Sequence, residues 1–122
     1  MKVLIIEDDK FVRTVYESEL HQENIEVELA VDGEEGMAKA KKNKPDLIIL
    51  DMILPKKNGF QILEELKKDA KLKNIPVVAC SSLSQKADID ETIKLGAVKY
   101  LSKEDYSQKQ VIQEVLKVLM SM

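Results

Sequence analysis

The amino-acid sequence predicts an α/β fold in which one parallel sheet is covered by helices on both faces. Short runs that are apolar at every position recur along the chain, as in strands that are buried on both faces. Amphipathic stretches with helical spacing separate these runs, and such alternation of strand and helix is typical of a parallel sheet. The length of 122 residues suits one domain, residues 1–122.

Five strands of two kinds are expected. Three are continuous apolar runs, at residues 3–6, 47–50 and 77–80. The other two, residues 25–31 and 98–101, carry charged residues among the apolar ones, which is typical of half-exposed edge strands. Three doubly buried strands and two edge strands fit the sheet order 2-1-3-4-5, which is the flavodoxin-like, doubly wound (βα)5 arrangement.

Five helices are expected in the remaining segments, at residues 10–22, 33–42, 59–69, 85–95 and 108–120. Candidate N-caps precede four of them: Asp32, Asn58, Ser84 and Ser107. Gln110 completes a capping box with Ser107, and Gly96 stands where the fourth helix would end. We expect the first helix to bury a stripe that includes Phe11, Val12 and Tyr16. Because the last helix runs to the end of the sequence, we expect no output domain after it.

Composition excludes several classes of protein. Lys and Arg number 19 against 22 Asp and Glu, and a pI near 5.3 argues against a nucleic-acid groove. One cysteine, Cys80, cannot form an internal disulfide, and one cysteine with one histidine cannot build the usual zinc sites. No apolar run approaches the ~18 residues of a membrane span, and the acids at 7–9 come too early for a signal peptide. We therefore expect a cytoplasmic protein.

Polar residues follow the predicted strands. They are Glu7, Asp8 and Asp9 after the first strand, Asp51 after the third, Ser81 and Ser82 after the fourth, and Ser102 and Lys103 after the fifth. Ligands of an open parallel sheet bind beyond the carboxyl ends of its strands. We therefore expect Asp8 and Asp51 to face one pocket that Ser81 and Lys103 flank.

The predicted pocket has the chemistry of phosphoryl transfer. Several carboxylates in a small space repel one another unless a cation neutralises them, and hard oxygen ligands suit Mg²⁺. A carboxylate beside Mg²⁺, with a lysine and a hydroxyl near it, is equipped to attack a phosphoryl group. Each residue alone has a structural explanation, such as a helix cap for the acidic turn. The convergence of four strand ends favours a functional site.

These residues resemble the receiver domain of bacterial two-component response regulators, over essentially the whole chain. The resemblance rests on residues 3–9, on 47–51 with Pro55 and Gly59, on 75–82, and on 96–103. It implies that Asp51 is the phosphoacceptor. It also implies that Lys103 pairs with the phosphoryl group and that Ser81 is the switch hydroxyl.

The resemblance assigns the metal ligands and the rest of the switch. Asp8 would bind Mg²⁺ directly, together with Asp51 and the backbone carbonyl of Ile53. Glu7 would bind the ion through water, and Asp9 is a third acid near it. Tyr100 would be the aromatic residue whose rotamer follows the movement of Ser81.

The sequence departs from the family's usual pattern after the lysine, where Glu104 replaces proline. We expect a trans bond between Lys103 and Glu104, because a cis bond without proline costs about 2.5–4 kcal/mol. The switch hydroxyl is serine instead of the commoner threonine, and Ser82 stands in place of alanine. None of these changes removes a reacting group.

The resemblance implies a signalling switch that catalyses only its own phosphorylation and dephosphorylation. A histidine kinase or a phosphotransfer protein would phosphorylate it. A downstream protein would bind the face formed by residues 85–95, 98–101 and 108–120, with no direct nucleic-acid binding and no membrane insertion. Apolar Ile53 and Leu83 would border the path of the hydrolytic water and prolong the life of the phosphorylated form.

Three alternatives stay open. The chain could be the receiver module of a larger regulator or of a hybrid kinase. A flavodoxin-like electron carrier would need a phosphate-cradling loop after the first strand, where three acids stand instead. An aspartyl phosphohydrolase would need a second acid two residues after the nucleophile, and Ile53 occupies that position.

Overall fold

A computed structural model of the chain describes all 122 residues and has five strands that alternate with five helices. The strands are β1 (Lys2–Ile6), β2 (Glu26–Ala30), β3 (Leu47–Leu50), β4 (Val77–Ser81) and β5 (Lys99–Ser102). The helices are α1 (Lys10–His21), α2 (Gly33–Asn43), α3 (Gly59–Lys68), α4 (Lys86–Lys94) and α5 (Gln108–Met120). All strand pairs are parallel and the sheet order is β2-β1-β3-β4-β5, so the predicted flavodoxin-like (βα)5 fold is confirmed.

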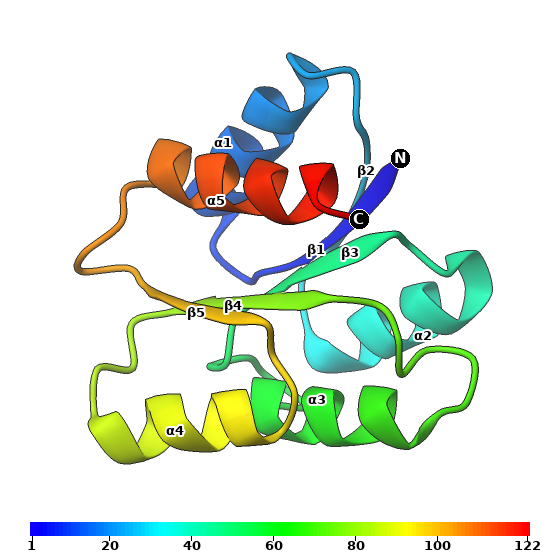
Figure 1. Ribbon diagram of the computed structural model, residues 1–122, viewed down its shortest axis with the longest axis vertical. Coiled ribbons are helices and arrows are strands. Elements are labelled where there is room, and N and C mark those ends of the chain that lie inside the picture. The colour runs from blue at the N-terminus through cyan, green and yellow to red at the C-terminus, as the bar shows by residue number, and fades with distance from the viewer.

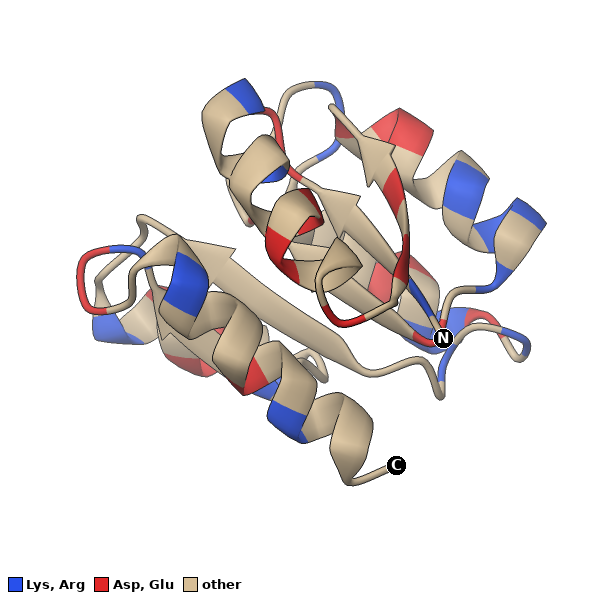
Figure 2. Ribbon diagram, turned by 90° about the horizontal axis from the view of Figure 1, so that it is seen from above, with Lys and Arg blue, Asp and Glu red and all other residues tan.

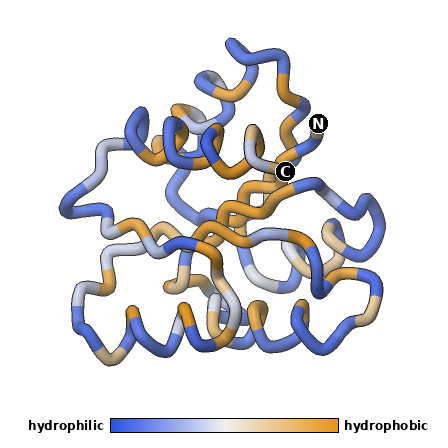
Figure 3. Tube along the Cα trace, in the orientation of Figure 1, coloured by the Kyte–Doolittle hydropathy of each residue, from blue (hydrophilic) through white to orange (hydrophobic).

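Two helices cover one face of the sheet and three cover the other. The helices α1 and α5 lie on one side, and α2, α3 and α4 lie on the opposite side (Figure 1). Side chains of a strand alternate between the faces, so Val3 and Ile5 join the core under α1 and α5, whereas Leu4 and Ile6 join the core under α2 and α3. The most apolar segments lie in the strands at the centre of the molecule (Figure 3).

The charge pattern of the sheet follows from this layering. The strands β3 and β4 carry no charged residue, and charged residues gather on helices and loops (Figure 2). The strand β1 has a charge only at its first residue, Lys2, whereas β2 and β5 carry charges among their apolar residues and form the edges as predicted. At the β2 edge, the ammonium group of Lys39 donates to the backbone carbonyl of Leu29 at 2.5 Å, and an edge lysine discourages pairing with another sheet.

Three of the four predicted helix caps are confirmed. Asp32, Asn58 and Ser107 each accept a hydrogen bond from the backbone N–H three residues later. The prediction for Ser84 is wrong, because α4 begins at Lys86 and its N-cap is Gln85, which makes no side-chain capping bond. The loop after β4 therefore extends past Ser84.

The predicted apolar stripe of α1 is wrong at one position. Val12, Tyr16 and Leu20 are buried at intervals of four residues. Phe11 precedes Val12 by one residue, which is about 100° round a helix of 3.6 residues per turn. Its side chain therefore leaves the stripe, and 68% of the residue surface is exposed. None of the helices has the length and apolar character that a membrane crossing requires.

Candidate functional site

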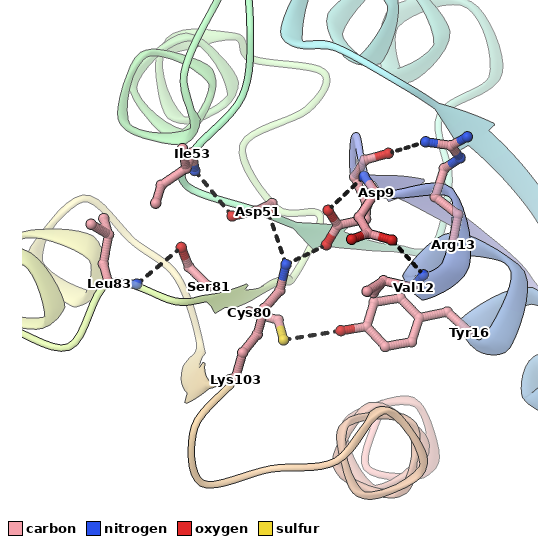
Figure 4. Close-up of polar contacts among 11 residues, drawn as sticks. Asp9, Val12, Arg13, Tyr16, Asp51, Ile53, Cys80, Ser81, Leu83 and Lys103 are labelled. Carbon is pink, nitrogen blue, oxygen red and sulfur yellow. Dashed lines mark hydrogen bonds and ion pairs between the residues drawn. The ribbon is translucent and has the colours of Figure 1, made fainter.

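The predicted site residues meet at the edge of the sheet where the strands end (Figure 4). Glu7 follows β1, Asp51 follows β3, Ser81 is the last residue of β4, and Lys103 follows β5. The backbone N–H of Asp51 donates to the carbonyl of Ile6 at 3.0 Å, which continues the pairing of β1 with β3. This hydrogen bond holds the two acidic turns side by side.

One ammonium group joins two buried carboxylates. The Nζ atom of Lys103 lies 2.7 Å from Oε1 of Glu7 and 3.0 Å from Oδ2 of Asp51. Glu7 is 2% exposed and Asp51 is 5% exposed. Burial lowers the pKa of Lys103, but its hydrogen bond to Glu7 and the charge of Asp51 outweigh that effect, so the pKa lies above its ordinary value. Lys103 therefore stays a cation and compensates the negative charges around it.

Glu7 is held through both its carboxylate and its backbone. Its Oε2 atom accepts the backbone N–H of Asp9 at 3.1 Å, and its backbone carbonyl accepts Nη1 of Arg13 at 2.9 Å. Burial, followed by the charge of Asp51, raises the pKa of Glu7 from 4.5 to about 7, against the opposing effect of Lys103. Without a further cation, this carboxylate is therefore close to taking up a proton at neutral pH.

Three carboxylates form a candidate divalent metal centre. Glu7, Asp8 and Asp51 each offer an oxygen, and these oxygens lie within 4.8 Å of one another. Asp8 is exposed whereas the other two residues are buried, so the cluster opens to solvent on the side of Asp8. Clustered carboxylate oxygens are hard ligands and suit a hard divalent cation that retains several waters.

Asp9 has a different role from its two neighbours. Its Oδ1 atom accepts the backbone N–H of Val12 at 3.1 Å, which makes Asp9 the N-cap of α1. The carboxylate of Asp9 is therefore engaged in the helix cap and is not part of the group formed by Glu7, Asp8 and Asp51.

The loop after β3 holds Asp51 from its other side. Oδ1 of Asp51 accepts the backbone N–H of Ile53 at 3.0 Å. Gly59, at the start of α3, lies against the same segment, since a Cβ there would come within 2.5 Å of Cα of Met52 and 2.8 Å of the Asp51 carbonyl oxygen. Only glycine permits α3 to approach the Asp51 segment this closely.

Leu83 connects the two predicted switch residues through its backbone. Its N–H faces the Oγ atom of Ser81 at 3.4 Å, and its carbonyl accepts the hydroxyl of Tyr100. Ser81 is buried and Tyr100 is half-buried, and burial raises the pKa of Tyr100. The Lys103–Glu104 bond is trans, as predicted, since the chain contains no cis peptide bond.

Two contacts beside the site were not predicted from the sequence. One is the hydrogen bond from Arg13 to the Glu7 carbonyl. Arg13 comes one helical turn after Asp9, and this spacing could have indicated that its side chain lies near the acidic turn. The other joins the Tyr16 hydroxyl to the Cys80 thiol at 3.1 Å. Cys80 is a buried core residue, and this burial raises the pKa of its thiol to about 11.

Comparison with known proteins agrees with this geometry. The family model described as "Response regulator receiver domain" matches residues 3–116. The chain belongs to the response regulator receiver domain family. Receiver domains are signalling switches that accept a phosphoryl group, and this membership decides against the electron carrier and the phosphohydrolase.

The relatives include a curated regulator and solved receiver structures. The receiver domain is 37% identical over 102 residues to the DNA-binding dual master transcriptional regulator RpaA of Synechocystis sp., a match that covers 84% of this chain and 42% of the relative. Similar structures include the phosphorylated cyanobacterial phytochrome response regulator RcpA, with TM-score 0.83, 34% identity and coverage of 96% and 89% of the two chains. The Mn²⁺-bound form of response regulator Rcp1 has TM-score 0.82, 27% identity and coverage of 99% and 92%. The chain spans less than half the length of the curated relatives RpaA and ycf27.

Proposed function

We propose that Asp51 is the phosphoacceptor of this receiver domain. The observation that carries the proposal is the position of Lys103, whose ammonium group bonds Asp51 and Glu7 at the edge where the strands end. A carboxylate oxygen of Asp51 would form the new bond to phosphorus while the bond from phosphorus to the donor's histidine nitrogen breaks. The electron pair of the broken bond stays on that nitrogen, and Lys103 neutralises charge on the phosphoryl oxygens.

We propose Mg²⁺ as the divalent cation of the acidic cluster. Asp8 and Asp51 would bind it directly, with the backbone carbonyl of Ile53 as the third protein ligand and Glu7 acting through water. The bound ion would supply positive charge beside the phosphoryl oxygens. The chain's own part is to hold its carboxylate oxygens within 4.8 Å of one another and to leave Asp8 open to solvent.

Phosphorylation would act on the α4-β5-α5 face through Ser81 and Tyr100. The hydrogen bond that the Ser81 hydroxyl accepts from the Leu83 N–H is long, at 3.4 Å, so this hydroxyl can turn towards a phosphoryl group on Asp51. The Tyr100 hydroxyl bonds the carbonyl of the same Leu83, so a change at Ser81 is passed to Tyr100. Phosphoryl contacts would in this way shift the population between two states of the face, where a downstream protein binds.

The phosphodonor would be a histidine kinase or a phosphotransfer protein, and the site would catalyse only its own phosphorylation and dephosphorylation. Because the matched relatives are longer, the alternative is a receiver module within a larger regulator or hybrid kinase. The net charge of −3 supports the absence of direct nucleic-acid binding. The single cysteine, Cys80, is buried and cannot form an internal disulfide, which supports a cytoplasmic location.

Mass spectrometry after incubation with Mg²⁺ and acetyl phosphate tests the proposal. We expect one phosphoryl group on the parent protein, lost on treatment with hydroxylamine and absent when Mg²⁺ is chelated. The variant Asp51→Asn should gain none, because an amide is a poor nucleophile. Asp105→Asn, at an exposed acid two residues after Lys103, is the matched control and should be phosphorylated normally. A hydroxylamine-labile phosphoryl group on Asp51→Asn would overturn the assignment.

A further inference from the structure

Arg13 is the only arginine of the chain, and its bond to the backbone of Glu7 places it beside the acidic cluster. Its Nη1 atom donates to the backbone carbonyl of Glu7 at 2.9 Å (Figure 4). No carboxylate lies within ion-pair distance of its guanidinium group. The charged side chain of Arg13, near the start of α1, therefore bonds a backbone oxygen instead of a carboxylate.

Three hydrogen bonds that involve side chains within the segment from Glu7 to Arg13 hold the turn between β1 and α1, in addition to the bond from Lys103 to Glu7. Two of them fix Glu7 and Asp9 through their carboxylates, at 3.1 Å from the N–H of Asp9 and 3.1 Å from that of Val12. The third, from Arg13, is the one that restrains the peptide unit between Glu7 and Asp8. The carboxylate of Asp8 makes no hydrogen bond or ion pair within the chain, so its position depends on this backbone.

We propose that Arg13 is a positioning residue for the metal centre. By holding the Glu7–Asp8 peptide unit, it presents the Asp8 carboxylate to the cation at the distance from Glu7 and Asp51 that the cluster requires. The inference rests on the proposed function, because it concerns the same acidic cluster. Groups that orient metal ligands typically change metal affinity by about 10–100-fold when they are removed.

Removing the charge of Arg13 and removing its hydrogen bond would change the affinity for a divalent cation in opposite directions. The direction of the change therefore shows whether Arg13 acts through its charge or by positioning Asp8. A guanidinium group near the cluster repels a divalent cation, and removing its charge alone would tighten binding. Removing the hydrogen bond would instead free the Asp8 peptide unit and weaken binding. A purely structural role, the pairing of one buried carbonyl, would lower the free energy of unfolding and leave the affinity unchanged.

Isothermal titration calorimetry with Mg²⁺ alone measures the metal affinity of the unphosphorylated protein and of its variants. Arg13→Met retains much of the aliphatic stem and removes the charge and the donor, and we expect it to bind Mg²⁺ about tenfold more weakly. Arg13→Lys retains the charge and one donor group, and we expect an affinity between those of Arg13→Met and the parent. The matched control is Lys10→Met, which removes a positive charge from the start of α1 at an exposed residue without an ion pair. It should bind Mg²⁺ at least as tightly as the parent.

Asp8→Asn separates failure of the inference from failure of the metal site. If the parent does not bind Mg²⁺, or if Asp8→Asn binds it as well as the parent, the proposed metal site is wrong and the inference falls with it. If Asp8→Asn binds weakly while Arg13→Met matches or exceeds the parent, the metal site stands and the positioning role is wrong. Weak binding by both variants, with normal binding by Lys10→Met, supports the positioning role.

Discussion

The lifetime of the proposed phosphoryl group on Asp51 would depend on the residues that surround the path of the attacking water. Ile53, two residues after the proposed phosphoacceptor Asp51, is 49% exposed. Leu83 is half-buried, and its backbone already contacts Ser81 and Tyr100. Neither side chain can hydrogen-bond a water, so we expect a long-lived phosphorylated form.

Polar substitutions at these two positions should shorten that lifetime. Ile53→Asn and Leu83→Glu each introduce a group that can orient the attacking water, and a barrier lower by ~1.4 kcal/mol would speed phosphate release about tenfold. Release of inorganic phosphate from purified phosphoprotein measures the effect. Val98→Asn is the control, because Val98 is 50% exposed and precedes β5 at the opposite end of the sheet. Equal rates in all four proteins would show that apolar shielding does not set the lifetime.

Among the elements, β5 and α5 are joined by an ion-pair group at the proposed partner face. Glu114 of α5 contacts Lys99 of β5 at 2.8 Å and Lys117 of its own helix at 2.8 Å. Hydrogen bonds from Lys117 and from Lys99 lower the pKa of Glu114 from 4.5 to about 2. The side chain of Glu114 is 19% exposed whereas that of Lys117 is 69% exposed, so the pair with Lys99 is the better shielded.

The lowered pKa of Glu114 predicts how the stability of the fold changes as the pH falls. A carboxyl group with a depressed folded-state pKa stabilises the fold above its unfolded value and loses that contribution as pH falls through the folded value. The stability that Glu114 adds should therefore be complete above about pH 5 and decline as the pH falls from 4.5 to about 2. Urea denaturation of the parent and of Glu114→Gln should give a difference that narrows over this range. A constant difference down to pH 2.5 would contradict the assignment, and Glu23→Gln, at an exposed acid without an ion pair, is the control.

Across the whole molecule, burial is distributed unevenly among the helices. The helix α5 buries Val111, Ile112, Val115 and Leu119, and α3 buries Gly59, Ile62, Leu63 and Leu66. The helix α4 buries only Thr92 and lacks a side-chain cap, and its Ile93 is 45% exposed. Segments with few buried contacts open at low free energy, so α4 is the helix that a change near Asp51 can move most easily.

Hydrogen exchange should reveal this uneven stability. We expect the amides of α4 to exchange faster than those of α3 and α5 in the unphosphorylated protein, because opening α4 exposes the least apolar surface. Mass spectrometry of proteolytic fragments after deuterium labelling measures the three helices together. Phosphorylation should then change exchange most between residues 83 and 103. Protection of α4 equal to that of α5 would contradict the prediction.

The order of strands and helices was determined by local pattern. Apolar runs such as 47–50 have no stable position except between two covered faces, and hydrogen-bonding caps such as Ser107 start helices at defined residues. The alternation of elements and the charges in β2 and β5 then determine which strands form the edges. The residues at the strand ends, Asp51 and Lys103 among them, follow from that order, because parallel strands end at one edge.

Only the tertiary structure decided contacts whose partners are distant in sequence or whose direction depends on packing. Lys103 bonds Glu7 across 96 residues, and the pKa of Glu7 near 7 comes from burial that no local pattern shows. Ser84 is a residue type that often caps helices, yet the path of the loop after β4 places the N-cap position at Gln85. Phe11 is apolar, as a residue of the buried stripe should be, but the rotation of α1 against the sheet leaves it exposed. Sequence pattern determines which residues reach the edge of the sheet, whereas packing determines which atoms they contact there.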